Sequence, residues 1–394
     1  MKQSLENSRY SKIFARPELP FYLILWSTVF LAALGLTMVL SASTVTSLQE
    51  NGNSYSIFMR QFFFLIIGTA AAYWAYKVRG TVWLRIAKIS LTVSILTLLL
   101  PFVSFLGKDV KGNLNWVEFW GFTLQPSEFA KFGLILWCAY QLKNIDLNRD
   151  GTKSLFVLLP AIAVIASIIL LQKDLGTALL ILLIFIGILF IAGAPLKLFL
   201  SVFVVGIVIG SAFVFSSAYR MNRFAALFDP FDEKYYKFSG WQPAHSIMGL
   251  ASGGLWGSGL GASKQKWANL AEAHTDFIFS VIGEELGLLG SLLVLGLYSA
   301  LIYAIVRVAL KTKDNFSRYA TAAIACWFIA QVTINIGSAT SLIPVIGVTL
   351  PFISYGGSSL LANLLAVGFV LGVARRIPEI AYGIKANQIR RSAI

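Results

Sequence analysis

Charged side chains are scarce in this sequence, at 13% of its 394 residues. Soluble globular proteins carry roughly 25% charged residues, so the composition excludes a typical cytosolic enzyme. A disordered chain is excluded as well, because 57% of the residues are hydrophobic and 14% are aromatic, whereas disordered segments are polar and poor in aromatics. The two cysteines, Cys138 and Cys326, both lie inside apolar runs. Their placement fits neither a disulfide framework nor a local metal-binding motif.

What the chain has in quantity is long apolar runs. A helix needs about 20 apolar residues to cross the hydrocarbon core of a bilayer, and ten segments meet or approach that length. They are 20–42, 57–76, 82–105, 126–142, 154–171, 177–193, 197–216, 277–307, 317–338 and 359–375. We therefore predict an all-α polytopic membrane protein with about ten transmembrane helices.

The positions of Lys and Arg predict the orientation. When both termini are placed in the cytoplasm, most of the 32 Lys and Arg residues fall on the cytoplasmic side, as the positive-inside rule requires. The net charge of +14 is then mainly a topology signal, and we expect no nucleic-acid partner. This division gives a cytoplasmic tail at 1–19, a membrane domain at 20–376 and a second cytoplasmic tail at 377–394. The first span is too long for a cleaved signal segment and is expected to stay as an anchor.

One connection is much longer than the others. Residues 217–276 form a large extracytoplasmic loop between the seventh and eighth spans, and loops of this length are usually functional or disordered. Its content of Trp, Phe and Tyr argues against disorder. Within it, residues 219–231 mix Arg220 and Arg223 with apolar residues, which is typical of a helix lying in the headgroup plane. A surface helix that packs on the bundle fits the same pattern.

Several polar clusters are expected near the outer face, where burial of an ionisable group is costly and therefore points to function. Gln125, Pro126 and Ser127 are typical of a helix start, with Glu128 favourable at its positive end. Glu128 and, one turn on, Lys131 are either part of this capping arrangement or functional. Between spans five and six, Lys173 and Asp174 are either turn residues or, for Lys173, a contact to phosphate.

The aspartate block 272–279 enters the eighth span, and here too two readings are open. Thr275 or Asp276 caps that helix, or Asp276 acts as a general base for a sugar hydroxyl. Glu284 lies about 12 Å further along a helix and on another face, so we expect it to support the site by hydrogen bonding. The Pro- and Gly-rich segment 344–358 predicts irregular backbone that lines a polar cavity. These residues alone fit both a transporter and an enzyme acting on a lipid substrate.

Four blocks in order carry a resemblance to a known family, and they span nearly the whole chain. They are QPSEFAK (Gln125–Lys131), QKDLGTA (Gln172–Ala178), EAHTDFIFSVIGEELG (Glu272–Gly287) and PFISYGGSS (Pro351–Ser359). Together they resemble the SEDS family (shape, elongation, division and sporulation), to which FtsW and RodA belong. The segments GLTMVLSAS (Gly35–Ser43) and GLGASKQK (Gly259–Lys266), together with Ala273, look more like the division branch, that of FtsW, than the elongation branch, that of RodA.

The resemblance implies a peptidoglycan glycosyltransferase that polymerises lipid II at the outer face of a bacterial cytoplasmic membrane, at the division septum. It implies that Asp276 is the catalytic residue. Lys173, Arg220 and Arg223 are then candidates to neutralise the pyrophosphate leaving group, with a divalent cation such as Mg²⁺ or Mn²⁺ as a further candidate. The remaining candidate substrate contacts are Trp116, Glu284, Ser354, Gly356 and Gly357.

The implied partners are a class B penicillin-binding protein of the FtsI type, other divisome proteins and membrane lipids. Three alternatives stay open: a lipid II flippase, an elongation polymerase like RodA, and a noncatalytic scaffold. A flippase should carry charged groups through the inner half of the bilayer. The polar clusters of this chain crowd the outer side, which favours the enzyme.

Overall fold

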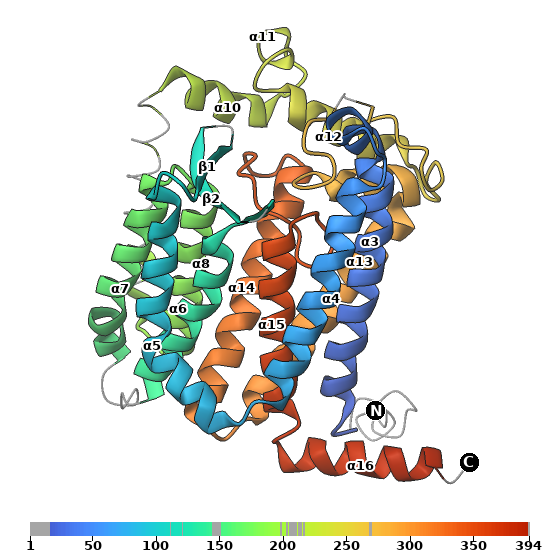
Figure 1. Cartoon of the computed structure of the whole chain (residues 1–394). Helices are drawn as coiled ribbons and strands as arrows, with labels where there is room; N and C mark the ends of the chain where they lie inside the picture. Colours follow the sequence, from blue (N-terminus) through green and yellow to red (C-terminus); the bar gives the residue numbers. More distant parts are fainter. Residues whose placement is uncertain are drawn as a thin grey trace, which may run out of the picture.

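The structure is a computed structural model that describes residues 16–392, except 111, 120, 144–150, 198, 202–203, 205–210, 212–214, 216 and 268–269. It is a bundle of long helices, with a small sheet and several short helices at one end (Figure 1). We call this end the outer end, following the predicted orientation. The bundle helices are α3 (Leu19–Asn51), α4 (Ser56–Lys77), α5 (Gly80–Leu99), α6 (Pro126–Lys143), α7 (Gly151–Leu171), α8 (Leu175–Ile191), α13 (Ile278–Lys311), α14 (Asn315–Ala339) and α15 (Gly357–Ala374).

Each of these helices overlaps one predicted span, which confirms the all-α membrane fold. Within the described part of the chain, 7 helices are long and apolar enough to cross a membrane. Helix α8 is shorter, at 17 residues, and α6 carries Glu128 and Lys131 among its apolar residues. The predicted span 197–216 falls mostly outside the described residues, so the count of ten stays a prediction. The predicted C-terminal tail contains a further helix, α16 (Pro378–Ser392), which lies below the bundle in Figure 1.

Close contact between α4 and α15 depends on small residues. A Cβ atom added at Gly368 of α15 would lie 2.2 Å from the carbonyl oxygen of Ala72 of α4. One turn on, the same atom at Gly372 would lie 3.0 Å from the Tyr76 carbonyl oxygen. Small residues four apart let two membrane helices approach until their backbones touch. This contact fixes α15, and with it the Gly356–Ser358 region at its outer end.

At the outer end, residues 107–124 form a three-stranded antiparallel sheet that the sequence analysis did not predict. Its strands are β1 (Gly107–Val110), β2 (Asn113–Phe119) and β3 (Phe122–Leu124), in the order β1-β2-β3. The third span was expected to continue to residue 105, but α5 ends at Leu99 and is followed by a 3₁₀ turn containing Pro101. Proline lacks the N–H that would continue the helix.

The long outer loop contains α10 (Ala218–Phe228), α11 (Glu233–Tyr236) and α12 (Trp241–Ser252), and α10 crosses the outer end of the bundle (Figure 1). The helix predicted over 219–231 is present, but it ends at Phe228, three residues before the predicted end. On α10 the Ala226 side chain is fully buried, whereas Phe224 and Phe228 are 43% and 77% exposed. Large exposed rings on an amphipathic helix are typical of a helix at a membrane surface. Arg223 and Leu227 of α10 also line a small cavity with Ile343 and Pro344, so both the headgroup-plane interpretation and packing on the bundle stay open.

Helix α13 is broken at Gly287, where φ is 69°. The break frees backbone groups, and the glycine-rich segment 254–259 bonds to them. Ser258 and Gly259 donate their N–H groups to the carbonyls of Glu284 and Glu285, while Leu288 donates to the carbonyl of Gly254. Non-helical backbone within a span survives only where protein or a water-filled cavity satisfies it. The eighth span, predicted to be unusually long, is thus two helical segments joined at Gly287.

Candidate functional site

Asp276 lies in the turn 271–277 that precedes α13. The N-cap residue of α13 is Phe277, so neither Thr275 nor Asp276 occupies that position. The turn is closed by the Glu272 carbonyl, which accepts from the N–H groups of Thr275 (3.1 Å) and Phe277 (3.2 Å). Asp276 is half-buried, and a Cβ added at Gly347 would lie 3.5 Å from its Oδ2 atom. The carboxylate therefore faces the segment that contains Gly347.

That segment, residues 344–356, has no helix or strand, as its prolines and glycines predicted. Ser354 binds it to the turn of Asp276: its hydroxyl donates to the Thr275 carbonyl (2.5 Å) and accepts from the Leu350 N–H (2.8 Å). The Tyr355 N–H adds a bond of 2.9 Å to the His274 carbonyl. Two sequence blocks about 80 residues apart are thus joined next to Asp276, and Ser354 is used for this junction.

Gln61 of α4 holds the other side of the same segment. Its Nε2 donates to the Ser354 carbonyl and its Oε1 accepts from the Gly356 N–H, both at 3.2 Å. Next to it, a Cβ added at Gly357 would lie 2.3 Å from the ring of Phe64. Gly357, the first residue of α15, therefore allows the chain to pass close to α4.

Asp174 connects the other blocks. Its Oδ1 accepts from the Thr177 N–H (2.9 Å), and its Oδ2 accepts from Thr177 Oγ1 (2.8 Å), Asn115 Nδ2 (2.8 Å) and Gln125 Nε2 (3.0 Å). The side chain is 8% exposed. One carboxylate thus binds the start of α8, strand β2 and the residue before α6. Asp174 lies in the turn between α7 and α8, as the sequence analysis expected, but its cap on α8 and its bonds to Asn115 and Gln125 were not predicted.

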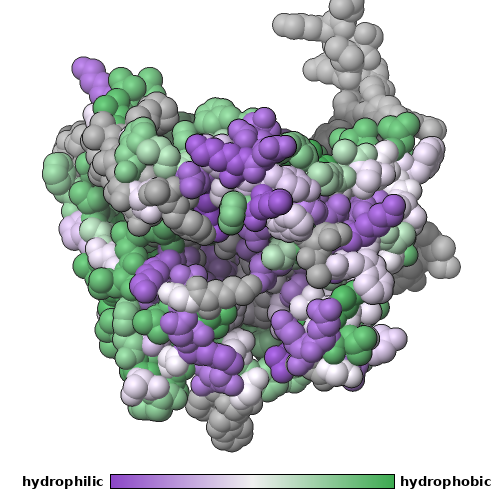
Figure 2. Space-filling model, turned by 90° about the horizontal axis from the view of Figure 1, so that it is seen from above, coloured by the Kyte–Doolittle hydropathy of each residue, from purple (hydrophilic) through white to green (hydrophobic). Residues whose placement is uncertain are grey.

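Direct contacts join these blocks to one another. Gln125 also donates its N–H to the Ser358 hydroxyl (2.9 Å), and a Cβ on Gly176 would lie 2.5 Å from the Ile346 carbonyl. Trp116, half-buried on β2, follows Asn115 directly. Seen from the outer end, hydrophilic residues surround a depression near the centre of the face (Figure 2). The four sequence blocks therefore form one polar site at the outer end.

Glu128 and Lys131 form a buried ion pair within the bundle. Lys131 Nζ lies 2.8 Å from Glu128 Oε1, and the Lys131 side chain is 1% exposed. Lys131 also reaches Gln331 of α14 (3.4 Å) and lies over the Trp327 ring. The predicted helix start at Pro126 is confirmed, with Glu128 in the first turn. Their charges compensate each other, so burial is tolerable without a further ion.

Glu284 is buried against residues 263–265 of the long outer loop. It accepts from Ser263 Oγ (2.5 Å) and from the N–H groups of Lys264 (2.9 Å) and Gln265 (3.4 Å). The adjacent Glu285 pairs with Lys266 at 3.3 Å and accepts from Ser41 Oγ of α3 at 2.7 Å. The geometry gives Glu284 a supporting role, which agrees with the expectation of hydrogen bonding. A contact between Glu284 and the substrate stays a prediction.

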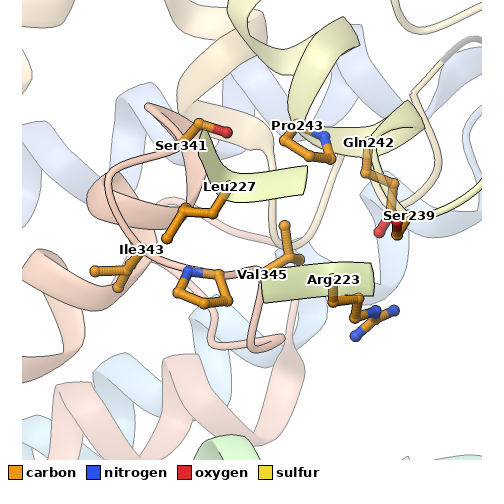
Figure 3. A pocket seen from close by; sticks show the side chains of 9 residues that line it. Arg223, Leu227, Ser239, Gln242, Pro243, Ser341, Ile343 and Val345 are labelled. Atoms are coloured by element: carbon orange, nitrogen blue, oxygen red, sulfur yellow. The ribbon is translucent and has the colours of Figure 1, made fainter. Parts of the chain in front are cut away.

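The side chains of two of the three predicted pyrophosphate cations are described by the structure. Lys173 is exposed in the α7–α8 turn with φ 64°, and the side chain of Arg220 lies outside the described residues. Arg223 of α10 lines two cavities, one of which also involves Pro243 and Val345 (Figure 3). That cavity, about 20 Å³, has room for about one water. The other, about 630 Å³, is lined also by Lys234 and Lys237 of the α10–α12 region.

The sequence analysis missed several functional candidates. Arg60 of α4 is exposed. Burial raises the pKa of the Tyr355 phenol, and the positive charge of Arg60 partly opposes this shift. Gln61, Gln331 and Asn335 are buried amides inside apolar helices. An amide within a membrane span is expected to bond across helices, so these residues carried a usable signal.

Comparisons with known proteins agree with this arrangement. A family model described as "Cell cycle protein" (FtsW/RodA/SpoVE) matches residues 22–378. A probable peptidoglycan glycosyltransferase FtsW of Mycobacterium tuberculosis is 36% identical over 97% of this chain and 72% of its own. Stage V sporulation protein E of Bacillus subtilis is 36% identical over 90% and 97%.

Solved structures are similar as well. One comes from work on the structural coordination of polymerization and crosslinking by a peptidoglycan synthase complex, with a TM-score of 0.71 and 28% identity over 90% of this chain and 98% of that one. The crystal structure of the rod shape determining protein RodA of Thermus thermophilus gives a TM-score of 0.64 and 27% identity over 90% and 96%. Since the family match covers all four blocks that build the polar site, this chain belongs to the FtsW/RodA/SpoVE family.

Proposed function

We propose that this chain is a peptidoglycan glycosyltransferase that polymerises lipid II at the outer face of the cytoplasmic membrane, with Asp276 as its general base. The observation that carries the proposal is the position of Asp276. Its carboxylate faces Gly347 at the outer end, in a turn bound to the Ser354 segment, and it does not occupy the N-cap of α13. The names of the relatives supply the reaction class.

The chemistry fits a single carboxylate. Asp276 takes the proton from the 4-hydroxyl of the acceptor sugar as that oxygen attacks the anomeric carbon of the donor. The bond from the anomeric carbon to the lipid pyrophosphate breaks, and the pyrophosphate leaves with the electron pair. Cations near the leaving oxygen stabilise the charge that develops there. Lys173, Arg220 and Arg223 stay the proposed cations, and Lys234 and Lys237 join Arg223 at the larger cavity.

A divalent cation was a further candidate for this charge. In the part of the chain that the structure describes, no group of three or more His, Cys, Asp or Glu side chains could hold a metal ion. Because Mg²⁺ is commonly bound by one or two carboxylates together with substrate phosphates, the divalent cation stays a candidate, and we assign no step to it.

We assign the division role and a class B penicillin-binding partner to the same proposal. Relatives named FtsW support the division role, and the similar chain from a complex that coordinates polymerization with crosslinking supports a transpeptidase partner. The other divisome proteins and the septal location follow from this role and are part of the proposal. RodA-like elongation is the alternative branch.

The proposal is tested by incubating the purified chain in lipid vesicles with lipid II, with and without the partner transpeptidase. Asp276→Asn should abolish glycan strands on gels while leaving the melting temperature nearly unchanged. Asp232→Asn is the matched control, because Asp232 is an exposed aspartate of the same loop that caps α11, and asparagine caps equally well. Strand formation by Asp276→Asn at the wild-type rate would refute the role of Asp276. Movement of intact lipid II across the vesicle membrane without polymer would favour the flippase.

A further inference from the structure

A single buried amide on α14 joins the two backbone segments that flank Asp276. Asn335 is 1% exposed, and its Nδ2 donates to the Asp276 carbonyl at 2.9 Å and to the Val348 carbonyl at 2.8 Å. Both N–H bonds of the amide are therefore used. One bond ends on the turn before α13 and the other on the irregular segment 344–356.

The orientation of this amide follows from its partners. Two carbonyl oxygens face the same end of the side chain, so the NH₂ group must point there, since the reversed amide would set three acceptors against one another. Asn335 Oδ1 is buried and has no hydrogen-bond partner among the described residues. The contacts of Asn335 therefore use its two donors, and among the described residues its acceptor has no partner.

One of the two carbonyls belongs to Asp276 itself, and the other belongs to the segment that its carboxylate faces. Val348 follows Gly347, the residue that the Asp276 carboxylate faces. Gly347 has φ 76°, which favours glycine, and a Cβ there would make an ordinary van der Waals contact of 3.5 Å with Asp276 Oδ2. By fixing the backbone of Asp276 and of Val348 to the same atom, Asn335 sets the distance between the carboxylate and the segment it faces.

Gln331, one turn earlier on the same helix, holds the next residue of the segment. Its Nε2 donates to the Thr349 carbonyl at 2.9 Å, and its Oε1 accepts from Trp327 Nε1 at 2.6 Å. Gln331 does not bond to Asp276 in these contacts. These two residues, four apart on α14, thus differ in what they bind. Gln331 bonds to the segment but not to the Asp276 turn in these contacts, whereas Asn335 bonds to both.

We propose that Asn335 is a positioning residue for Asp276, which holds the turn of the general base and the Gly347–Val348 backbone in the geometry that the reaction requires. The inference rests on the proposed function. Because the base must lie within hydrogen-bonding reach of the acceptor hydroxyl, a small displacement of Asp276 lowers the rate of the chemical step more than it weakens substrate binding.

The test measures kcat, KM and melting temperature for lipid II polymerisation by the full chain in lipid vesicles. Asn335→Leu nearly keeps the shape but removes both donors, and we expect kcat to fall about 10- to 100-fold with KM within about threefold. Asn335→Gln keeps both donors, and a glutamine at the neighbouring position 331 already reaches the same segment. This variant should therefore retain more kcat than Asn335→Leu. Asn335→Ser supplies one hydroxyl donor for two carbonyls and should lie between leucine and wild type.

Asn363→Leu is the matched control. Asn363 of α15 is fully buried, also has an Oδ1 without a described partner, and donates to Ser359 at 3.3 Å. We expect its melting temperature to fall about as much as that of Asn335→Leu, with kcat within about twofold of wild type.

Three results would overturn the inference: wild-type kcat in Asn335→Leu, an equal loss of kcat in Asn363→Leu, or a raised KM with unchanged kcat. If Asn335→Leu does not fold, wild-type kcat in Asn335→Ser overturns it instead. The proposed function fails separately, because it is judged by Asp276→Asn. An inactive Asp276→Asn beside a fully active Asn335→Leu would reject only the role of Asn335.

Discussion

Replacing Asp174 by alanine removes the acceptor for hydrogen bonds from three parts of the chain. The cap bond from the Thr177 N–H is one of them, and loss of an aspartate cap costs about 1 kcal/mol. Asn115, Gln125 and the Thr177 hydroxyl supply the other donors. A hydrogen bond to a charged group contributes about 1.5–3 kcal/mol when buried, and Asp174 is only 8% exposed.

Water entering the gap will offset part of this loss, so we expect Asp174→Ala to lower the free energy of unfolding by about 3–5 kcal/mol. Asp314→Ala is the matched control. Asp314 caps α14 through a bond of 2.9 Å to the Ser317 N–H, and it is exposed. Its replacement should therefore cost only the cap, about 1 kcal/mol.

Unfolding of the two variants in mixed micelles with increasing dodecyl sulfate measures the difference. Asp174→Asn adds a third point, because asparagine keeps the cap but offers one acceptor oxygen in place of two, so its loss should be intermediate. Equal destabilisation by Asp174→Ala and Asp314→Ala would refute the reasoning. It would mean that the bonds from β2 and from the start of α6 contribute nothing to the stability of the outer end.

Two further predictions concern the break in α13, and both are read from the same unfolding assay. Lys266→Met leaves the fully buried Glu285 without its cation and should lower the free energy of unfolding by about 3–5 kcal/mol. Its control, Lys311→Met, removes a more exposed ion pair and should lower it by at most about 1 kcal/mol. Similar losses of stability in the two variants would contradict the role of burial. Gly287→Ala places a Cβ at φ 69°, 2.4 Å from a backbone nitrogen, and should cost at least about 2 kcal/mol. Gly296→Ala, which has open space around it, should stay within about 1 kcal/mol; a stable Gly287→Ala would show that the break tolerates a side chain.

The local signals of the sequence predicted the elements that local chemistry decides. Pro126 with Glu128 marked the start of α6 correctly, and the mixture of Arg223 with apolar residues located α10. Prolines and glycines predicted the irregular backbone of 344–356. In each case the determining residues lie within the element itself.

The elements that the sequence analysis missed depend on distant partners. Gly287 stands in a leucine-rich run that reads as continuous helix, and the break exists because the segment 254–259 takes up the freed backbone groups. Asp174 looked like an ordinary turn residue, because Asn115 and Gln125 reach it from about 50 residues away or more. The short strands of the sheet likewise require one another. Periodicity within one segment does not report such pairings.

Left-handed backbone in residues other than glycine occurs in turns and irregular segments between the helices. Among the described residues, it occurs at Lys173, Glu272, Ser341 and Phe352, with φ between 56° and 66°. Each such residue costs about 1–3 kcal/mol and persists only where its surroundings over-determine it. At Glu272 the turn exposes a carbonyl that closes the Asp276 loop, and at Lys173 it precedes the inward-facing Asp174. Phe352 packs its ring against Phe328 of α14.

This placement relates the stability of the bundle to the proposed chemistry. The apolar packing of α4, α14 and α15 supplies the free energy of folding that offsets the backbone strain. Gln61, Gln331 and Asn335 connect those helices to the strained segments. Preorganised groups stabilise a transition state without paying for reorganisation during the reaction. A site built on strained turns that rigid helices hold in place needs little ordering when substrate binds. Variants that loosen these amide contacts should therefore lower kcat under conditions in which the protein is still folded. A purely structural network would instead lower the melting temperature and leave the kcat of the folded protein unchanged.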